Sequence, residues 1–196
     1  MNEKKKLAVL FPGIGYTCDK PLLYYSAKLA IKADYEIVPV PYGNFPRGVK
    51  GNAEKMHQSF LLAGEQAEEI LKDIRWSRYE DIVFVSKSIG TVVSSCYAAK
   101  KDLKVRSILF TPVEETFLYA NRPAVAFHGT GDPWADTGKI RSACEKAGIL
   151  LFLTEHANHS LETGDIQKDI GIMAETMSRV ESFFRGDGIF APDLFT

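Results

Sequence analysis

The chain has 196 residues, of which 45% are hydrophobic and 25% are charged, and its formal net charge is -1. This length and composition fit one globular domain that covers residues 1–196. With no surplus of basic residues and no acidic tail, the composition argues against a nucleic-acid partner.

The cysteines are an odd and widely spaced set without a Cys-x-x-Cys pair: Cys18, Cys96 and Cys144. They indicate neither a disulfide framework nor a zinc site, so we expect no bound metal and a reducing compartment. The apolar run after Lys6 is broken at residues 12–13, unlike a signal peptide. No apolar stretch approaches the ~20 residues of a membrane span, so we expect a cytoplasmic protein without a membrane partner.

Apolar runs typical of strands alternate with amphipathic runs typical of helices. The expected strands cover residues 7–11, 35–40, 82–85, 105–110, 124–128 and 149–153, and the expected helices cover residues 19–32, 53–74, 89–100, 137–147 and 166–184. The strand runs are short and continuously apolar, as in strands that are buried on both faces. The alternation predicts an α/β fold, with a doubly wound, mostly parallel six-stranded sheet and helices on both faces.

Local signals set the expected helix boundaries. The first helix opens with Asp19 and Pro21, and Asp136 and Gly148 cap the two ends of the fourth. Two helices carry apolar stripes at helical spacing: Phe60, Ala63, Ala67, Ile70, Leu71 and Ile74 in one, and Ile166, Ile170, Met173, Met177, Val180 and Phe184 in the other. The apolar residues of the tail, 185–196, are expected to pack on the body or on a second subunit in a homo-oligomer.

In a parallel sheet, functional residues lie on the loops at the carboxyl ends of the strands. Residues 82–91 run from an apolar strand through Ser88 and Gly90 into a helix, which is the pattern of a nucleophile elbow. Ser86 replaces the first glycine of Gly-x-Ser-x-Gly, and serine is small enough for this position. Lys87 is expected to be exposed at the elbow. The alternative is an ordinary turn in which Ser86 or Ser88 caps the helix.

Two later loops carry an acid and a histidine. Asp132 follows the fifth strand and His159 follows the sixth, so the chain order is serine, acid, histidine. Asp136 competes with Asp132 but is better explained as a helix cap. His156 competes with His159. The other histidines are expected to have no catalytic role, His128 as a buried structural residue and His57 as a solvent-facing one.

On these residues, the chain from about residue 7 to residue 184 resembles a small α/β-hydrolase without a large cap domain. The resemblance implies that Ser88 is the nucleophile, Asp132 the acid and His159 the general base. It also implies an oxyanion hole made by the backbone N–H of Ile89 and one N–H of the first loop, from Ile14, Gly15 or Tyr16, with Ile14 favoured and Tyr16 next. No cofactor is implied.

Aromatic residues on the same loops are candidates for a substrate wall, namely Tyr16, Phe45, Phe117 and Trp134. The sequence therefore predicts a serine hydrolase that acts on a small or medium ester or thioester through an acyl-enzyme. Two alternatives use the same fold: a lyase or acyltransferase, and a binding or regulatory protein without turnover. A nucleotide-binding domain is a third alternative, but residues 13–15 lack the third glycine, and no acidic residue ends the second strand.

Overall fold

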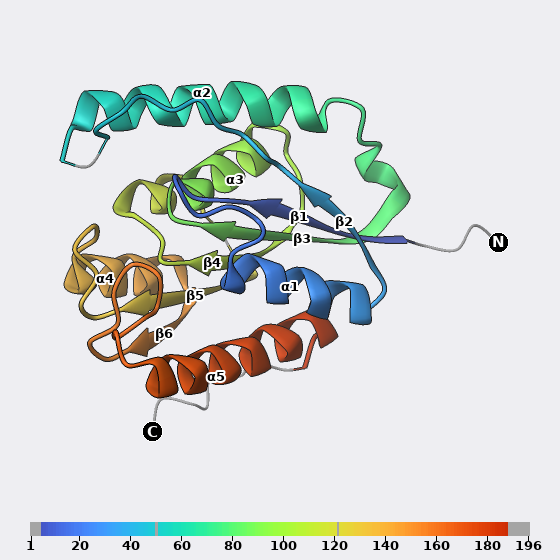
Figure 1. The fold of residues 1–196 in the computed structure, drawn as a ribbon. Helices are drawn as coiled ribbons and strands as arrows, with labels where there is room; N and C mark the ends of the chain where they lie inside the picture. The colour runs from blue at the N-terminus through green and yellow to red at the C-terminus, as the bar shows by residue number, and fades with distance from the viewer. Residues whose placement is uncertain (1–4, 50, 121, 188–196) are drawn as a thin grey trace.

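The computed structural model describes residues 5–49, 51–120 and 122–187 (Figure 1). Its centre is a sheet of six strands in the order β2-β1-β3-β4-β5-β6, and every neighbouring pair is parallel. The strands are β1 (Lys5–Phe11), β2 (Tyr35–Pro39), β3 (Tyr79–Lys87), β4 (Arg106–Phe110), β5 (Ala124–Gly129) and β6 (Leu150–Thr154). The predicted doubly wound sheet is confirmed.

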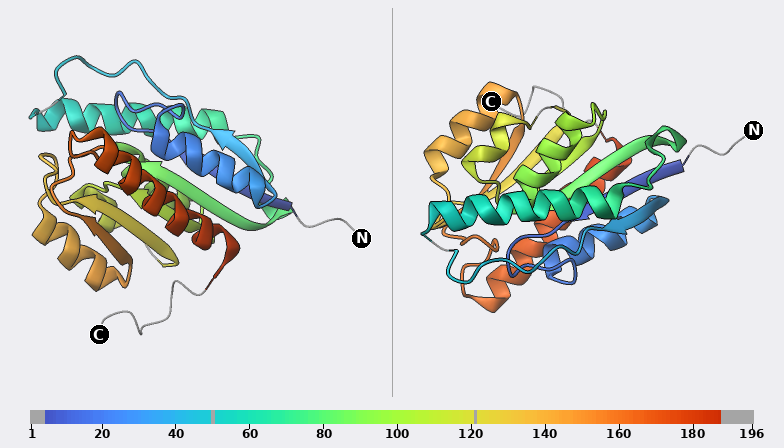
Figure 2. Two further views of the ribbon diagram at one scale, coloured as in Figure 1. Left: turned by 60° about the horizontal axis from the view of Figure 1, so that its bottom comes forward. Right: turned by 90° about the horizontal axis from the view of Figure 1, so that it is seen from above.

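Helices cover both faces of this sheet (Figure 2). They are α1 (Pro21–Lys32), α2 (Ala53–Leu71), α3 (Ile89–Lys100), α4 (Thr137–Ala147) and α5 (Ile166–Arg185), with short 3-10 helices η1 (Trp76–Arg78) and η2 (Glu114–Leu118). Helices α1 and α5 pack together on one face, over Val83 and Val85 of β3. Helices α2 and α3 cover Phe84 on the other face, and α4 lies beside them over Leu109. The core is thus split into layers by the alternation of side chains along each strand.

Caps explain where the helices begin and end. The side chain of Asp136 accepts a hydrogen bond from the Lys139 N–H at 2.9 Å, and Gly148 closes α4 in the left-handed conformation with φ 62°. Both predicted caps are confirmed. The start of α1 differs from the prediction, since the helix begins at Pro21 and its N-cap is Lys20 rather than Asp19.

The predicted apolar stripes are only partly buried. On α2 the buried line runs through Ser59, Ala63, Ala67 and Leu71. Ile70 is 38% exposed because it precedes this line by one position, which is about 100° of helical rotation.

On α5, Val180 and Phe184 are buried, but Ile166 and Ile170 are 74% and 60% exposed. The buried residues of α5 lie in its second half, where the helix packs against α1: Thr176, Val180, Phe183 and Phe184.

Among the described residues, no helix combines the length and the apolar character that crossing a bilayer requires. The expected packing of the tail falls largely on residues 188–196, which lie outside the described ranges.

Candidate active site

Ser88 occupies a strained turn between β3 and α3. Its backbone has φ 55° and ψ -126°, in the region that side chains other than glycine rarely adopt. The Ser88 N–H donates to the Phe110 carbonyl at 3.0 Å, and the Ser88 carbonyl accepts from the Thr91 N–H at 2.8 Å. Both bonds hold the turn in place, as expected for an elbow that projects a side chain from the end of a strand.

The elbow depends on close approach between α3 and β1. A Cβ on Gly90 would lie 2.3 Å from the carbonyl oxygen of Phe11, so this position admits glycine alone. Ser86 occupies the place of the first glycine of the elbow motif. It is fully buried, and its hydroxyl donates to the Ile108 carbonyl at 3.2 Å. This buried position accommodates a serine because the side-chain hydroxyl is hydrogen-bonded.

The structure brings together the three residues that the sequence singled out. His159 Nε2 lies 2.7 Å from Ser88 Oγ, and His159 Nδ1 lies 2.7 Å from Asp132 Oδ2. The second carboxylate oxygen of Asp132 accepts from the Trp134 N–H at 2.8 Å. These contacts join three loops that are far apart in sequence but meet at the carboxyl edge of the sheet.

Burial and charge tune this group. Burial lowers the pKa of His159, the hydrogen bond to Asp132 opposes the change, and the positive charge of Lys87 adds to it. Burial acts to raise the pKa of Asp132, but the hydrogen bond and charge of His159 and the Trp134 N–H together bring it below its usual value. Asp132 therefore stays ionised and His159 stays neutral near pH 7, which is the protonation state that a general base requires.

Lys87 is buried rather than exposed, contrary to the expectation from the sequence. It is 1% exposed, and its Nζ lies 5.0 Å from the centre of the Tyr16 ring. Burial lowers its pKa to about 7, against the opposing attraction of Asp132 and Glu162. The last residue of β3 thus places an amine behind the triad.

The first loop narrows the choice of oxyanion donors. Gly13 and Tyr16 pair with each other, since the Tyr16 N–H donates to the Gly13 carbonyl at 3.2 Å and the Gly13 N–H donates back at 3.0 Å. Because the Tyr16 N–H is already bound to the Gly13 carbonyl, Tyr16 is no longer a candidate oxyanion donor. Within the described ranges, no acceptor lies in hydrogen-bonding range of the Ile14 N–H. Ile89 is the first residue of α3, and the first N–H groups of a helix have no acceptor within the helix.

A cavity of ≈ 510 Å³ opens beside Ser88. Its apolar lining comes from α2, α3, η2 and the loop after β5, and includes Met56, Phe60, Ile89, Val92, Leu118 and Trp134. The Trp134 ring also stacks on His159, with the ring centres 5.6 Å apart.

Three of the four predicted aromatic substrate residues lie outside this cavity. Phe117 packs in the core cluster beneath α4, and the Tyr16 hydroxyl accepts from the Leu22 N–H at 3.0 Å. Phe45, the other aromatic candidate, packs against Tyr42. Sequence reasoning missed Met56 and Val92, and it assigned Phe60 to the core stripe, because helical periodicity does not separate a residue that faces the core from one that lines a cavity.

The competing acid, Asp136, caps α4, and the three remaining histidines differ in their burial. His156 is exposed, and its N–H donates to Thr130 Oγ1 at 2.8 Å. His57 is exposed at the cavity, and His128 is fully buried. Among the described residues, no cluster of His, Cys, Asp and Glu side chains has an arrangement suited to a metal ion.

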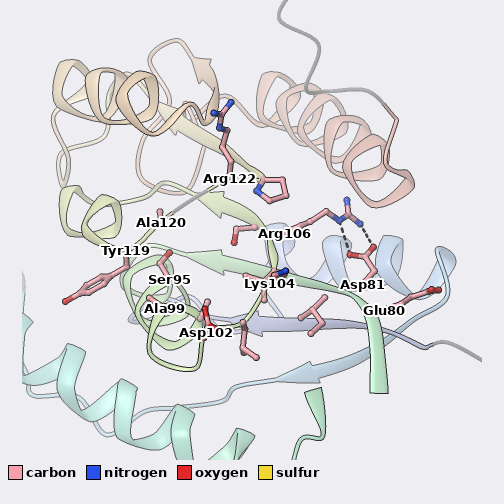
Figure 3. Close-up of a pocket in the computed structure, with 16 residues that line it drawn as sticks. Glu80, Asp81, Ser95, Ala99, Asp102, Lys104, Arg106, Tyr119, Ala120 and Arg122 are labelled. Atoms are coloured by element: carbon pink, nitrogen blue, oxygen red, sulfur yellow. Dashed lines mark hydrogen bonds and ion pairs between the residues drawn. The ribbon is translucent and has the colours of Figure 1, made fainter. Parts of the chain in front are cut away.

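A second cavity, of ≈ 590 Å³, lies at the opposite edge of the sheet, at the amino ends of β3 and β4 (Figure 3). Arg106 spans part of its wall and binds both carboxylate oxygens of Asp81, at 3.0 and 2.6 Å. These charges neutralise each other. Asp81 lies near the amino end of β3, whereas Ser88 follows its carboxyl end.

No protein-family model and no curated protein matches this chain. Its structure is similar to Est1E from Butyrivibrio proteoclasticus, solved with ferulic acid bound, at 10% identity and a TM-score of 0.69, covering 93% of this chain and 89% of that one. It is also similar to Pyrococcus furiosus esterase Pf2001, at 12% identity and a TM-score of 0.67, covering 94% and 84%. Thermogutta terrifontis esterase 2 aligns at 18% identity and a TM-score of 0.62, covering 97% and 87%. This chain therefore has the α/β-hydrolase fold.

Proposed function

We propose that this protein is a serine hydrolase that cleaves small or medium esters or thioesters through an acyl-enzyme. The observation that carries the proposal is the pair of 2.7 Å contacts that align Ser88 Oγ, His159 and Asp132. Two further features support it: the strained backbone of Ser88 and the esterases among the proteins of similar fold.

In the proposed reaction, His159 Nε2 takes the proton of the Ser88 hydroxyl while Oγ attacks the substrate carbonyl. Asp132 holds the imidazole in the required tautomer and stabilises the imidazolium. The N–H groups of Ile89 and Ile14 donate to the oxyanion. The tetrahedral intermediate collapses, and His159 gives the proton to the leaving alcohol or thiol. Water, deprotonated by His159, then attacks the acyl-enzyme and releases a carboxylic acid and free Ser88.

The cavity beside Ser88 supports a small or medium apolar acyl group. Its ≈ 510 Å³ falls in the range of about 300–1,000 Å³ that is typical of small-molecule sites. Phe60, Val92 and Leu118 offer apolar walls, and Glu114 and Glu115 also line the space. We propose that an acyl group without a negative charge enters here, because a carboxylate or phosphate would face these acids.

The test is covalent labelling with a fluorophosphonate probe, together with hydrolysis of p-nitrophenyl butyrate and of the matching butyryl thioester. Labelling is expected for the wild type and for Ser77→Ala, an exposed serine in η1. Ser88→Ala should not be labelled, and its kcat should fall about 10⁴- to 10⁶-fold, as for the loss of a triad nucleophile. Absence of both labelling and turnover in folded wild type would refute the proposal.

A further inference from the structure

His128 contacts the back of the triad. It lies at the end of β5, four residues before Asp132, and both residues have 0% side-chain exposure. His128 Nε2 is 3.1 Å from the hydroxyl oxygen of Thr137, the first residue of α4. His128 Nδ1 is 3.8 Å from Asp132 Oδ2, which is the oxygen that also binds His159.

The Nδ1 atom is buried without a hydrogen-bond partner among the described residues. A buried polar atom in this condition costs free energy and calls for an explanation. If Nδ1 carried its lone pair, that lone pair would face a carboxylate oxygen. If Nδ1 carries the proton, the positive end of an N–H dipole faces the same oxygen instead. The second arrangement is the favourable one.

Thr137 accommodates this tautomer, because a hydroxyl both donates and accepts, and the Asp132 oxygen beside Nδ1 decides between the two tautomers. With the ring proton on Nδ1, the Thr137 hydroxyl donates to Nε2. The charged and titratable groups that face His128 are Asp132, His159 and Asp136. Burial, more than any of them, lowers the pKa of His128, so the ring stays neutral.

The carboxylate of Asp132 needs this dipole because water does not reach it. Trp134 N–H binds one of its oxygens, and His159 Nδ1 binds the other. A carboxylate has about four lone-pair directions, so these two bonds leave it incompletely solvated. His128 supplies a third, longer interaction.

We propose that His128 is a positioning residue for the acid of the triad, with Thr137 donating to Nε2 in the tautomer whose Nδ1–H stabilises the Asp132 carboxylate. The polar chain then runs from Thr137 through His128, Asp132 and His159 to Ser88. Its role in turnover rests on the proposed function, whereas the tautomer of His128 does not.

The kinetic test compares His128→Leu with His128→Asn, whose side-chain N–H lies near the place of Nδ1. Loss of the dipole makes the pair of Asp132 and His159 bind a proton more readily, so His128→Leu should move the acid limb of kcat/KM to higher pH. Its kcat should fall about three- to tenfold at unchanged KM, as expected for a charge–dipole interaction that is longer than a hydrogen bond. His128→Asn should restore the wild-type limb. An unshifted limb in His128→Leu, or no rescue by asparagine, would overturn the proposal.

Thr137→Val provides a second variant that keeps the ring. It should shift the limb in the same direction by less, and the double variant with His128→Leu should match His128→Leu alone, since both act through one chain. Additive effects would contradict the chain. His156→Asn is the matched control: it is exposed, its φ of 58° suits asparagine, and its profile should equal that of the wild type.

Nitrogen NMR of the whole protein tests the tautomer without any substrate. The proton of His128 is expected on Nδ1, and a proton on Nε2 would overturn the proposal. NMR titration of His159 should show a higher pKa in His128→Leu than in the wild type, and an unchanged pKa would count against it. If the wild type hydrolyses nothing, the proposed function fails, and these two spectra still decide the role of His128.

Discussion

Lys87 shows how strand register can bury a charged residue. Side chains alternate along β3, so Val83, Val85 and Lys87 face α1 and α5. The turn that projects Ser88 begins only after Lys87, which is why the lysine stays inside while its neighbour meets the cavity. A buried amine of this kind destabilises the folded state whenever it is protonated.

The pKa of Lys87 predicts a pH-dependent stability. The folded pKa is about 7 and the usual value is 10.5, so the cost is full below pH 7, about 5 kcal/mol, and disappears as the pH rises to 10.5. We expect Lys87→Met to be more stable than the wild type at pH 6 and the difference to shrink toward pH 10. Urea unfolding across this range measures it.

The exposed Lys104→Met provides the control and should follow the wild type at every pH. A difference between Lys87→Met and the wild type that does not vary with pH would show that Lys87 titrates as in water.

At the level of elements, the start of α3 is the most constrained join in the fold. Ser88 has a strained backbone with positive φ, and Gly90 lies against the carbonyl of Phe11. The structure therefore ties the nucleophile to the position of β1. Any residue that pushes α3 away from β1 should move Ser88 out of reach of His159.

We expect Gly90→Ala to lose both stability and labelling by a fluorophosphonate, because its Cβ would overlap a backbone oxygen at 2.3 Å. Gly171→Ala is the matched control. Nothing lies within 4 Å of that Cβ in the exposed face of α5, so alanine should stabilise the helix by about 0.5–1 kcal/mol. Thermal unfolding with labelling of both variants tests this, and normal labelling of Gly90→Ala would contradict it.

One turn further along α3, Val92 lines the cavity beside Ser88. We expect Val92→Phe to fill part of this space. In a series of p-nitrophenyl esters, its kcat/KM should fall more for octanoate than for acetate, and by about tenfold or more for one displaced hydrophobic contact. Fluorophosphonate labelling should persist, because the apolar Val92 side chain makes none of the hydrogen bonds that hold Ser88, His159 and Asp132 together. An equal loss for all chain lengths would show that the acyl group binds elsewhere.

For the molecule as a whole, a polar cluster at the amino edge of the sheet joins elements that are distant in sequence. Arg106 of β4 binds Asp81 of β3 (Figure 3). It also donates to the hydroxyl of Tyr35 in β2 and to the carbonyl of Phe183 in α5. The side chain of Arg106 is 18% exposed and that of Asp81 is 27% exposed. The cluster thus fastens the last helix to the central strands, at the edge opposite the candidate active site.

Arg106→Met should lower the free energy of unfolding by about 2–4 kcal/mol, because it leaves the Asp81 carboxylate poorly paired in a partly buried place. Lys72→Met removes an exposed ion pair with Glu69 and should cost less than about 1 kcal/mol. Urea unfolding measures both. Equal effects of the two substitutions would mean that the Arg106 cluster is as weak as a surface pair.

Much of the fold follows from local patterns in the sequence. Continuous apolar runs predicted all six strands, and small displacements occurred at their ends, since β3 covers residues 79–87 instead of 82–85. Periodicity placed the helices, but it assigned Ile70, Ile166 and Ile170 to the core. Burial at a helix end depends on which distant elements pack against it, which is not a local property.

The order of Ser88, Asp132 and His159 was written in the sequence, because each follows an apolar strand with turn residues beside it. By itself the sequence therefore determined the fold class and the residues that could form a triad. Only the tertiary structure decided that their side chains lie 2.7 Å apart, that the Tyr16 N–H is already bonded, that Lys87 is buried, and that the buried His128 faces Asp132. The physical reason is that periodicity acts along one element, whereas hydrogen bonds between loops and burial arise where distant elements pack.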